Sequence, residues 1–345
     1  MLKKPPRRSL SAFPTTEESL ALQASLLDGD RAIEAWKRLS ATGNPLEGGV
    51  SWIAPLLMAN LARLIPEDPW VRNNPHFLTL ANLQGRAITE SAQSTLHCLA
   101  EASVPTLALK GLALGATVYA SPGLRTVSDF DILVPRTLVF GAMKALEARG
   151  LRSGSGGPRT PADLRANHAH VFYPHKAHQP SIDLHWHVLA SARGDEDDEF
   201  FWSGSEPLAV GTAPTRALCP EDQLLHVLIH GVRWTRMPHV RWVADAVMVL
   251  RRSLPLFRVD RFLASVARFE AAVPVQEGLR FVFDLTGEGG DTLDRVEKLK
   301  TSRFAQKAFE ARAAAYEDRT ITERIALRFE SALWSRRAQG PKRGP

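Results

Sequence analysis

Only two cysteines, Cys98 and Cys219, occur in the 345 residues of the chain, and long apolar runs are missing. The two cysteines are far apart and lack the close spacing of zinc ligands, so we expect reduced thiols, as is usual in the cytoplasm. No run of about 18 or more apolar residues occurs, which argues against a transmembrane helix. The basic start of the chain has no apolar stretch behind it and does not resemble a secretory signal. We therefore predict a cytoplasmic protein without a membrane partner.

The chain also has fewer acidic than basic residues. The 43 lysines and arginines outnumber the 37 aspartates and glutamates, and the formal net charge is +6. This charge suits a polyanionic ligand such as a nucleotide and permits contact with nucleic acid. However, the basic excess is concentrated at the two ends of the chain. We predict disordered basic tails at residues 1–14 and 336–345, and we do not favour a nucleic-acid partner on charge alone.

Two aspartates separated by one residue, Asp129 and Asp131, stand in an apolar segment. Alternate residues of a strand share a face, so the two carboxylates point the same way and Phe130, Ile132 and Val134 point to the other side. Two carboxylates within about 7 Å of each other repel, and a divalent cation such as Mg²⁺, which prefers oxygen ligands, relieves the repulsion. The alternative is a strand edge with two solvated acids.

A candidate phosphate-binding turn precedes the acidic strand. Residues 104–109 predict a short buried strand and residues 112–119 predict a helix, and Lys110 and Gly111 join the two. A glycine at such a junction lets backbone N–H groups approach an anion, and the helix N-terminus favours negative charge. Lys110 adds a positive charge at the turn, and Arg125 in the following loop is a candidate to neutralise phosphates.

A third carboxylate lies in a second alternating segment, residues 181–188. Its apolar residues share one face, and Asp183, His185 and His187 share the other. If this strand lies beside the first acidic strand, three carboxylates converge and can hold two metal ions about 3.5–4 Å apart. The alternative is that Asp183 belongs to a solvent-facing side. We interpret the histidines as active-site residues able to relay a proton, with a zinc pair or an ordinary surface as alternatives.

Together, residues 109–111, 124–134 and 182–186 resemble the uncharacterised nucleotidyltransferase family of the DNA polymerase β-like nucleotidyltransferase superfamily. The superfamily pattern is a glycine turn that opens a helix, an Asp-x-Asp strand and a third aspartate on a later strand. The resemblance covers about residues 100–190 and extends more loosely to about residue 250. This chain has Gly111-Leu112 where the superfamily usually has Gly-Gly or Gly-Ser.

The resemblance implies that Asp129 and Asp131 are metal ligands, and that Asp183 binds the catalytic metal and helps to deprotonate the acceptor. It implies two Mg²⁺ ions, with Mn²⁺ as a substitute, and an NTP such as ATP as co-substrate. The predicted nucleotide- and cofactor-binding residues around the three aspartates are Lys110, Gly111, Arg125, Ser128 and His185.

Apolar periodicity predicts helices on both sides of this core. We expect an N-terminal helical region at residues 15–100, a catalytic core at 101–190 and a C-terminal helical region at 191–335. The predicted fold class is therefore α+β, with a small mixed-sheet nucleotidyltransferase core flanked by helical regions.

Two polar features interrupt the apolar pattern of the C-terminal region. Asp222, His226 and His230 share a helix face, which we interpret as a hydrogen-bonded face rather than a metal site. Asp245 stands in an apolar helix and needs a charged or hydrogen-bonding partner. We predict that Asp245 braces the nucleotide cleft.

These features predict a metal-dependent enzyme that moves a nucleoside monophosphate from an NTP to an acceptor hydroxyl and releases pyrophosphate. The acceptor is a small molecule, a peptide or a protein. Two alternatives remain, namely a non-catalytic nucleotide- or RNA-binding module on the same fold, and kinase-like transfer of the terminal phosphate.

Overall fold

The computed structural model describes residues 11–175, 179–190, 192, 194–233, 240–253 and 256–311. The predicted tail at residues 336–345, and the first ten residues of the tail predicted at 1–14, lie outside the described part of the chain.

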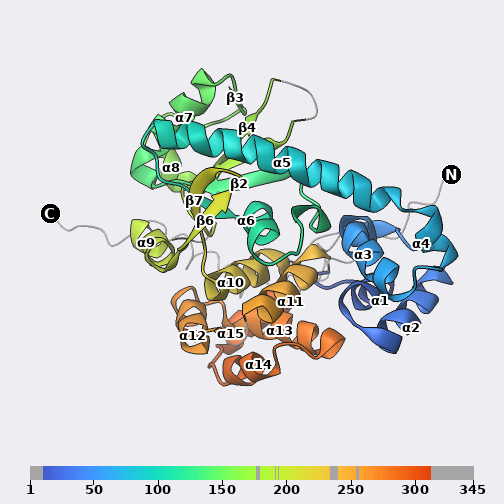
Figure 1. Ribbon diagram of the computed structural model, residues 1–345. Helices are drawn as coiled ribbons and strands as arrows, with labels where there is room; N and C mark the ends of the chain where they lie inside the picture. Colours follow the sequence, from blue (N-terminus) through green and yellow to red (C-terminus); the bar gives the residue numbers. More distant parts are fainter. Residues whose placement is uncertain are drawn as a thin grey trace, which may run out of the picture.

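A mixed sheet of seven strands, in the order β3-β4-β5-β2-β1-β7-β6, forms the centre of the described chain (Figure 1). The strands are β1 Leu107–Leu109, β2 Asp129–Leu133, β3 Arg152–Ser153, β4 Ala169–Tyr173, β5 Ser181–His185, β6 Glu206–Val210 and β7 Ala213–Ala217. Strand β2 pairs antiparallel with β1 and parallel with β5. The acidic strand is therefore an interior strand, which excludes the alternative of a solvated sheet edge.

One face of the sheet is covered by two helices, α5 (His76–Glu101) and α7 (Val139–Ala148), and α5 runs across it in Figure 1. Phe130 and Ile132 from β2 are fully buried in the core on this side, as are side chains of β5. The predicted burial of these residues away from the aspartates is confirmed. Alternation along each strand thus leaves the acidic side chains on the opposite face.

That opposite face is approached by α6 (Lys110–Thr117), α10 (Pro220–Gly231) and α11 (Arg241–Ser253). Leu107, Leu109 and Leu133 of the sheet join leucines of α6 and α10 in a second core, which also holds apolar residues of both flanking helical regions. Apolar residues of both helical regions therefore pack on the acidic side of the sheet, while α5 of the N-terminal region covers the other face. The α+β class is confirmed.

The remaining helices flank the sheet. The other N-terminal helices are α1 Thr16–Leu26, α2 Gly29–Ser40, the 3-10 helix η1 Gly48–Ile53, α3 Ala54–Leu64 and α4 Pro69–Asn73. The others are η2 Pro122–Leu124, η3 Arg136–Leu138, α8 Asp163–Ala166, α9 Asp195–Gly204, α12 Val259–Arg268, α13 Ala272–Thr286, α14 Gly290–Glu297 and α15 Arg303–Ala311. Among the described helices, none combines the length and the apolar character that crossing a membrane requires.

Residues 206–217 differ from the helical region expected for residues 191–335. They form the hairpin of β6 and β7, which extends the sheet next to β1. Gly211, at φ +60°, makes the turn between the two strands. Thr215 then donates a hydrogen bond of 3.0 Å to the carbonyl oxygen of Thr106 and connects the hairpin to the start of β1.

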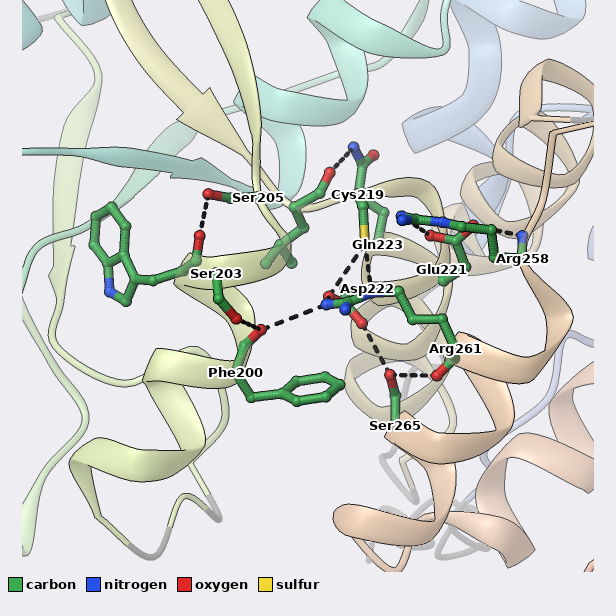
Figure 2. Close-up of polar contacts among 12 residues, drawn as sticks. Phe200, Ser203, Ser205, Cys219, Glu221, Asp222, Gln223, Arg258, Arg261 and Ser265 are labelled. Atoms are coloured by element: carbon green, nitrogen blue, oxygen red, sulfur yellow. Dashed lines mark hydrogen bonds and ion pairs between the residues drawn. The ribbon is translucent and has the colours of Figure 1, made fainter.

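A buried polar network joins α10 to α12, as Figure 2 shows. Asp222 is fully buried and binds the Arg261 guanidinium, the Ser265 hydroxyl at 2.9 Å and the Cys219 thiol at 3.2 Å. The predicted hydrogen bonding of Asp222 is confirmed. Burial, and then the neighbouring Asp222 carboxylate, raise the pKa of the Cys219 thiol to about 12, so this cysteine stays protonated near neutral pH.

We expect Asp222→Ala to lower the free energy of unfolding by about 3–5 kcal/mol, because it leaves the Arg261 charge without its carboxylate in a buried site. Urea denaturation measures the change. The matched control is Asp260→Ala on α12, which removes an exposed pair with Arg295 and should change stability little. Equal stabilities of the two variants would contradict a stabilising role of the buried network.

Candidate active site

The register of β2 and β5 places Asp131 directly opposite Asp183 on the same face of the sheet. One carboxylate oxygen of each, together with a ring nitrogen of His185, lies within 4.8 Å of the others. The adjacency of the two acidic strands, on which the three-carboxylate hypothesis depends, is therefore present. The grouping differs from the predicted ligand set, because it contains His185 and not Asp129.

Asp131 is buried and bound by two neighbours. Lys110 Nζ donates to Asp131 Oδ1 at 2.5 Å, and His185 Nε2 lies 2.9 Å from the same oxygen. Burial alone would raise the pKa of Asp131, but the hydrogen bond with His185 and the charge of Lys110 outweigh it and hold that pKa well below its usual range. Asp131 is therefore ionised at neutral pH.

Asp183 is half-buried and behaves in the opposite way. Burial, and then repulsion from the Asp131 carboxylate, raise the pKa of Asp183, although His185 and Lys110 act against the rise. Lys110 and His185 stabilise the negative charge of Asp131, but they do not fully compensate that of Asp183, so the pair of carboxylates lacks positive charge. This donor set of carboxylates and an imidazole fits a divalent cation such as Mg²⁺ or Mn²⁺, which would neutralise the excess negative charge.

Asp129 lies on the same face two residues before Asp131, and it is half-buried. The exposed Ser128 hydroxyl donates to Asp129 Oδ1 at 3.3 Å. The three aspartates Asp129, Asp131 and Asp183 form an acidic row on this face of the sheet. Asp129 lies at its outer end, at the start of β2 and outside the compact group of Asp131, Asp183 and His185.

The strand-to-helix turn is made by Lys110, which adopts a left-handed conformation with φ +45°. A non-glycine residue pays conformational strain there, which its bond to Asp131 helps to offset. Gly111 serves a different purpose. A Cβ atom added at Gly111 would lie 2.3 Å from Arg125 Nη1 and 3.0 Å from Val127 Cγ1, so glycine is required for their close approach.

Arg125 is bound inside the protein by Asp245 of α11. Its Nε and Nη2 donate to the two carboxylate oxygens of Asp245 at 2.8 and 2.9 Å, and Tyr119 donates to the same carboxylate at 2.8 Å. Burial would lower the pKa of Arg125, but the charge of Asp245 outweighs it and raises that pKa. Asp245, a carboxylate in an apolar helix, therefore has the charged and hydrogen-bonding partners that were expected for it. This buried bidentate pair joins α11 to the loop before β2.

A cavity of about 290 Å³ lies over the acidic face, between the sheet and helices α6, α10 and α11. Six of the predicted site residues line it, namely Lys110, Gly111, Arg125, Asp129, Asp131 and Asp183. His185 is buried beneath the carboxylates, and Ser128 lies outside the lining.

The cavity wall also contains residues that the sequence did not assign to the site, above all His226 of α10 and Arg241 of α11. Burial, and then the nearby His230, hold the pKa of His226 well below its usual range, so its ring is neutral at pH 7. Arg241 lies four residues before Asp245, a spacing that places both on one helix face. This spacing was the available signal for Arg241, but only the fold shows that the face meets the acidic strand.

A family model described as uncharacterised nucleotidyltransferase matches residues 52–287. The solution structure of the antibiotic-resistance factor ANT(2'')-Ia is similar at 14% sequence identity, with a TM-score of 0.36, over 56% of this chain and 96% of that chain. The crystal structure of ANT(2'')-Ia in complex with adenylyl-2''-tobramycin is similar at 12% identity, with a TM-score of 0.36, over 53% of this chain and 97% of that chain. An antigenic nucleotidyltransferase-like protein from Paracoccidioides brasiliensis is similar at 11% identity (58% and 94%, TM-score 0.38). No curated protein matches the chain in sequence.

The opposite pKa shifts of the facing aspartates predict opposite effects on stability. In EDTA at pH 7, Asp183→Asn should raise the melting temperature by a few degrees, because it removes a carboxylate destabilised by burial and by Asp131. Asp131→Asn should lower it, because Lys110 and His185 lose their charged partner. Thermal unfolding followed by circular dichroism measures both.

The pH dependence follows from the direction of each shift. The raised pKa of Asp183 costs stability above that pKa, and the cost vanishes as the group becomes protonated in acid. The gain from Asp183→Asn should therefore shrink as the pH falls. Melting temperatures that change in the same direction for both variants at pH 7 would contradict this electrostatic description.

Proposed function

The chain belongs to the uncharacterised nucleotidyltransferase family, whose model matches well over half of its residues, and we propose that it transfers a nucleoside monophosphate from an NTP to an acceptor hydroxyl. Pyrophosphate is the second product. The observation that carries the proposal is the in-register pair of Asp131 and Asp183 beside Lys110, at the floor of a cavity. The proposed partners are an NTP and a hydroxyl group of a small molecule, a peptide or a protein.

Asp129, Asp131 and Asp183 are the proposed metal ligands, with His185 fixing the position of the Asp131 carboxylate. The expected cations are two Mg²⁺ ions, or Mn²⁺ in their place. When bound, they supply positive charge that neutralises the phosphate oxygens. The excess of carboxylate over basic charge on this face supports the assignment.

The chain's own residues provide binding, orientation and proton transfer. Lys110, which is paired with Asp131, begins α6, and the backbone N–H groups at this helix N-terminus favour phosphate. Asp183, with its raised pKa, is suited to accept the proton of the acceptor hydroxyl. The hydroxyl oxygen then forms a bond to the α-phosphorus, and the bond to pyrophosphate breaks. Catalysis consists mainly of positioning and charge stabilisation.

Two other activities would use the same cavity. Kinase-like transfer of the terminal phosphate needs the same positive charge at a different phosphorus, and a binding module needs no acceptor. The mass of the acceptor after the reaction distinguishes the three activities. Nucleotidyl transfer adds a nucleoside monophosphate, kinase-like transfer adds a phosphate, and a binding module adds nothing.

We expect Asp129→Asn to lower nucleotidyl transfer by about 100-fold or more, since a metal ligand contributes several kcal/mol of charge stabilisation. The protein is incubated with α- or γ-labelled NTPs, Mg²⁺ and pools of metabolites and peptides, and added mass and pyrophosphate are measured. Asp129 is chosen because it lies outside the buried contacts of Asp131, so the variant should keep the wild-type melting temperature.

The control for this experiment is Asp260→Asn, an exposed carboxylate on α12 that does not line the cavity. It should leave transfer unchanged. Wild-type rates in the Asp129→Asn variant would contradict the metal assignment. NTP binding without added mass for any acceptor would favour the binding module.

A further inference from the structure

Three basic residues line the cavity among the described residues, and two of them are already neutralised. Lys110 binds Asp131, and Arg125 binds Asp245 through two hydrogen bonds. Arg241 forms no ion pair with a carboxylate in the described part of the chain. It is therefore the basic side chain of this cavity whose charge is left for a ligand.

Arg241 is nevertheless held in place. Its Nη1 donates to the carbonyl oxygen of Thr126 at 2.6 Å, and its guanidinium carbon lies 4.6 Å from the centroid of the Trp52 ring. A guanidinium stacked on an aromatic face keeps its edge donors in the plane of the group, where they can bind an anion. The hydrogen bond to Thr126 uses one donor and leaves others directed elsewhere.

The Trp52 ring is supplied by the N-terminal helical region. It belongs to η1, which is connected to α1 by a hydrogen bond of 3.0 Å from Gly49 N to Glu18 Oε1. A Cβ atom at Gly49 would lie 2.4 Å from Cγ2 of Val240, the residue immediately before Arg241. Glycine at this position lets η1 pack directly against the start of α11.

The electrostatic surroundings of Arg241 favour an anionic ligand. Burial, and then the positive charge of Arg125, lower the pKa of Arg241, while Asp245 and Asp129 act in the other direction. Asp245 is already shared with Arg125 and Tyr119, so it provides little neutralisation. A partly buried guanidinium remains charged at neutral pH, and an uncompensated charge in such a site is stabilised when an anion binds it.

We propose that Arg241, positioned by the Trp52 ring and the Thr126 carbonyl, binds the polyphosphate chain of the NTP. The inference rests on the proposed function and gives the phosphate contact to Arg241, where the sequence had suggested Arg125. A planar guanidinium binds phosphate oxygens through two parallel hydrogen bonds, which the ammonium group of lysine does not reproduce. Arg125 instead joins α11 to the loop before the acidic strand, and Trp52 is a positioning residue.

Isothermal titration of the full chain with ATP and with inorganic tripolyphosphate, each in Mg²⁺ buffer and in EDTA, tests this assignment. Arg241→Gln should raise the Kd of both ligands by about tenfold or more, and Arg241→Lys should give an intermediate Kd. The matched control is Arg251→Gln on the same helix, whose side chain pairs with Glu288 outside the cavity and whose loss should leave each Kd within about twofold.

Two variants of Trp52 test its positioning role. Trp52→Phe keeps an aromatic face and should bind tripolyphosphate with nearly wild-type affinity, whereas Trp52→Ala should bind it about threefold more weakly. Equal binding by these two variants would overturn the role of the ring. Melting temperatures of all variants show that a weaker affinity does not come from unfolding.

The possible results separate this inference from the function on which it rests. If the wild-type protein binds ATP and Arg241→Gln binds it equally well, the role of Arg241 is wrong and the proposed transfer is unaffected. If Arg241→Gln weakens tripolyphosphate binding but the wild-type protein transfers no nucleotide to any acceptor, the phosphate contact holds and the transfer reaction is wrong. A wild-type protein that binds neither ligand overturns both.

Discussion

The parallel pairing of β2 with β5 puts Asp131 across from Asp183, and the rest of the candidate site is arranged around that pair. The register is enforced from the opposite face of the sheet, where Phe130, Ile132 and Leu184 are fully buried. A shift of one residue would turn these apolar side chains toward the cavity and move the carboxylates into the core. Hydrophobic burial therefore holds two like charges together that would otherwise separate.

The basic residues around this pair of carboxylates differ in whether a carboxylate already binds them. Lys110 adopts a left-handed backbone and binds Asp131, and Arg125 is committed to Asp245 of α11. Arg241, which rests on the Trp52 ring from the N-terminal helices, stays available for a ligand. The cavity is lined by the sheet, α6, the loop before β2 and the helices α10 and α11, and the N-terminal helical region contributes through the contact of Trp52 with Arg241. Contacts between residues more than 100 positions apart in the chain thus hold Arg125 against Asp245 and Arg241 against the Thr126 carbonyl.

Features that depend on neighbouring residues could be predicted from the sequence. Alternation in residues 129–134 and 181–186 gave the correct apolar face of both strands, because the period of a strand is local. The alternation predicted beyond the end of β5 was wrong for Val188, which is buried in the core on the acidic side of the sheet. The hairpin of residues 206–217 was not predicted, since Pro207 and Pro214 weaken a strand pattern and are tolerated here near the sheet edge. The assignment of Arg125 to phosphate could not be judged either, because its partner Asp245 follows 120 residues later. Side-chain pairing of this kind appears only once the chain is folded.

The central claim is that the facing carboxylates of β2 and β5 bind a divalent cation in the presence of a nucleotide. The most direct measurement is anomalous diffraction from crystals grown with Mn²⁺ and a non-hydrolysable NTP analogue. The account predicts an anomalous peak at coordination distance from both Asp131 and Asp183, with the polyphosphate beside it. Saturating Mn²⁺ bound elsewhere, with neither carboxylate in contact with the ion, would contradict it.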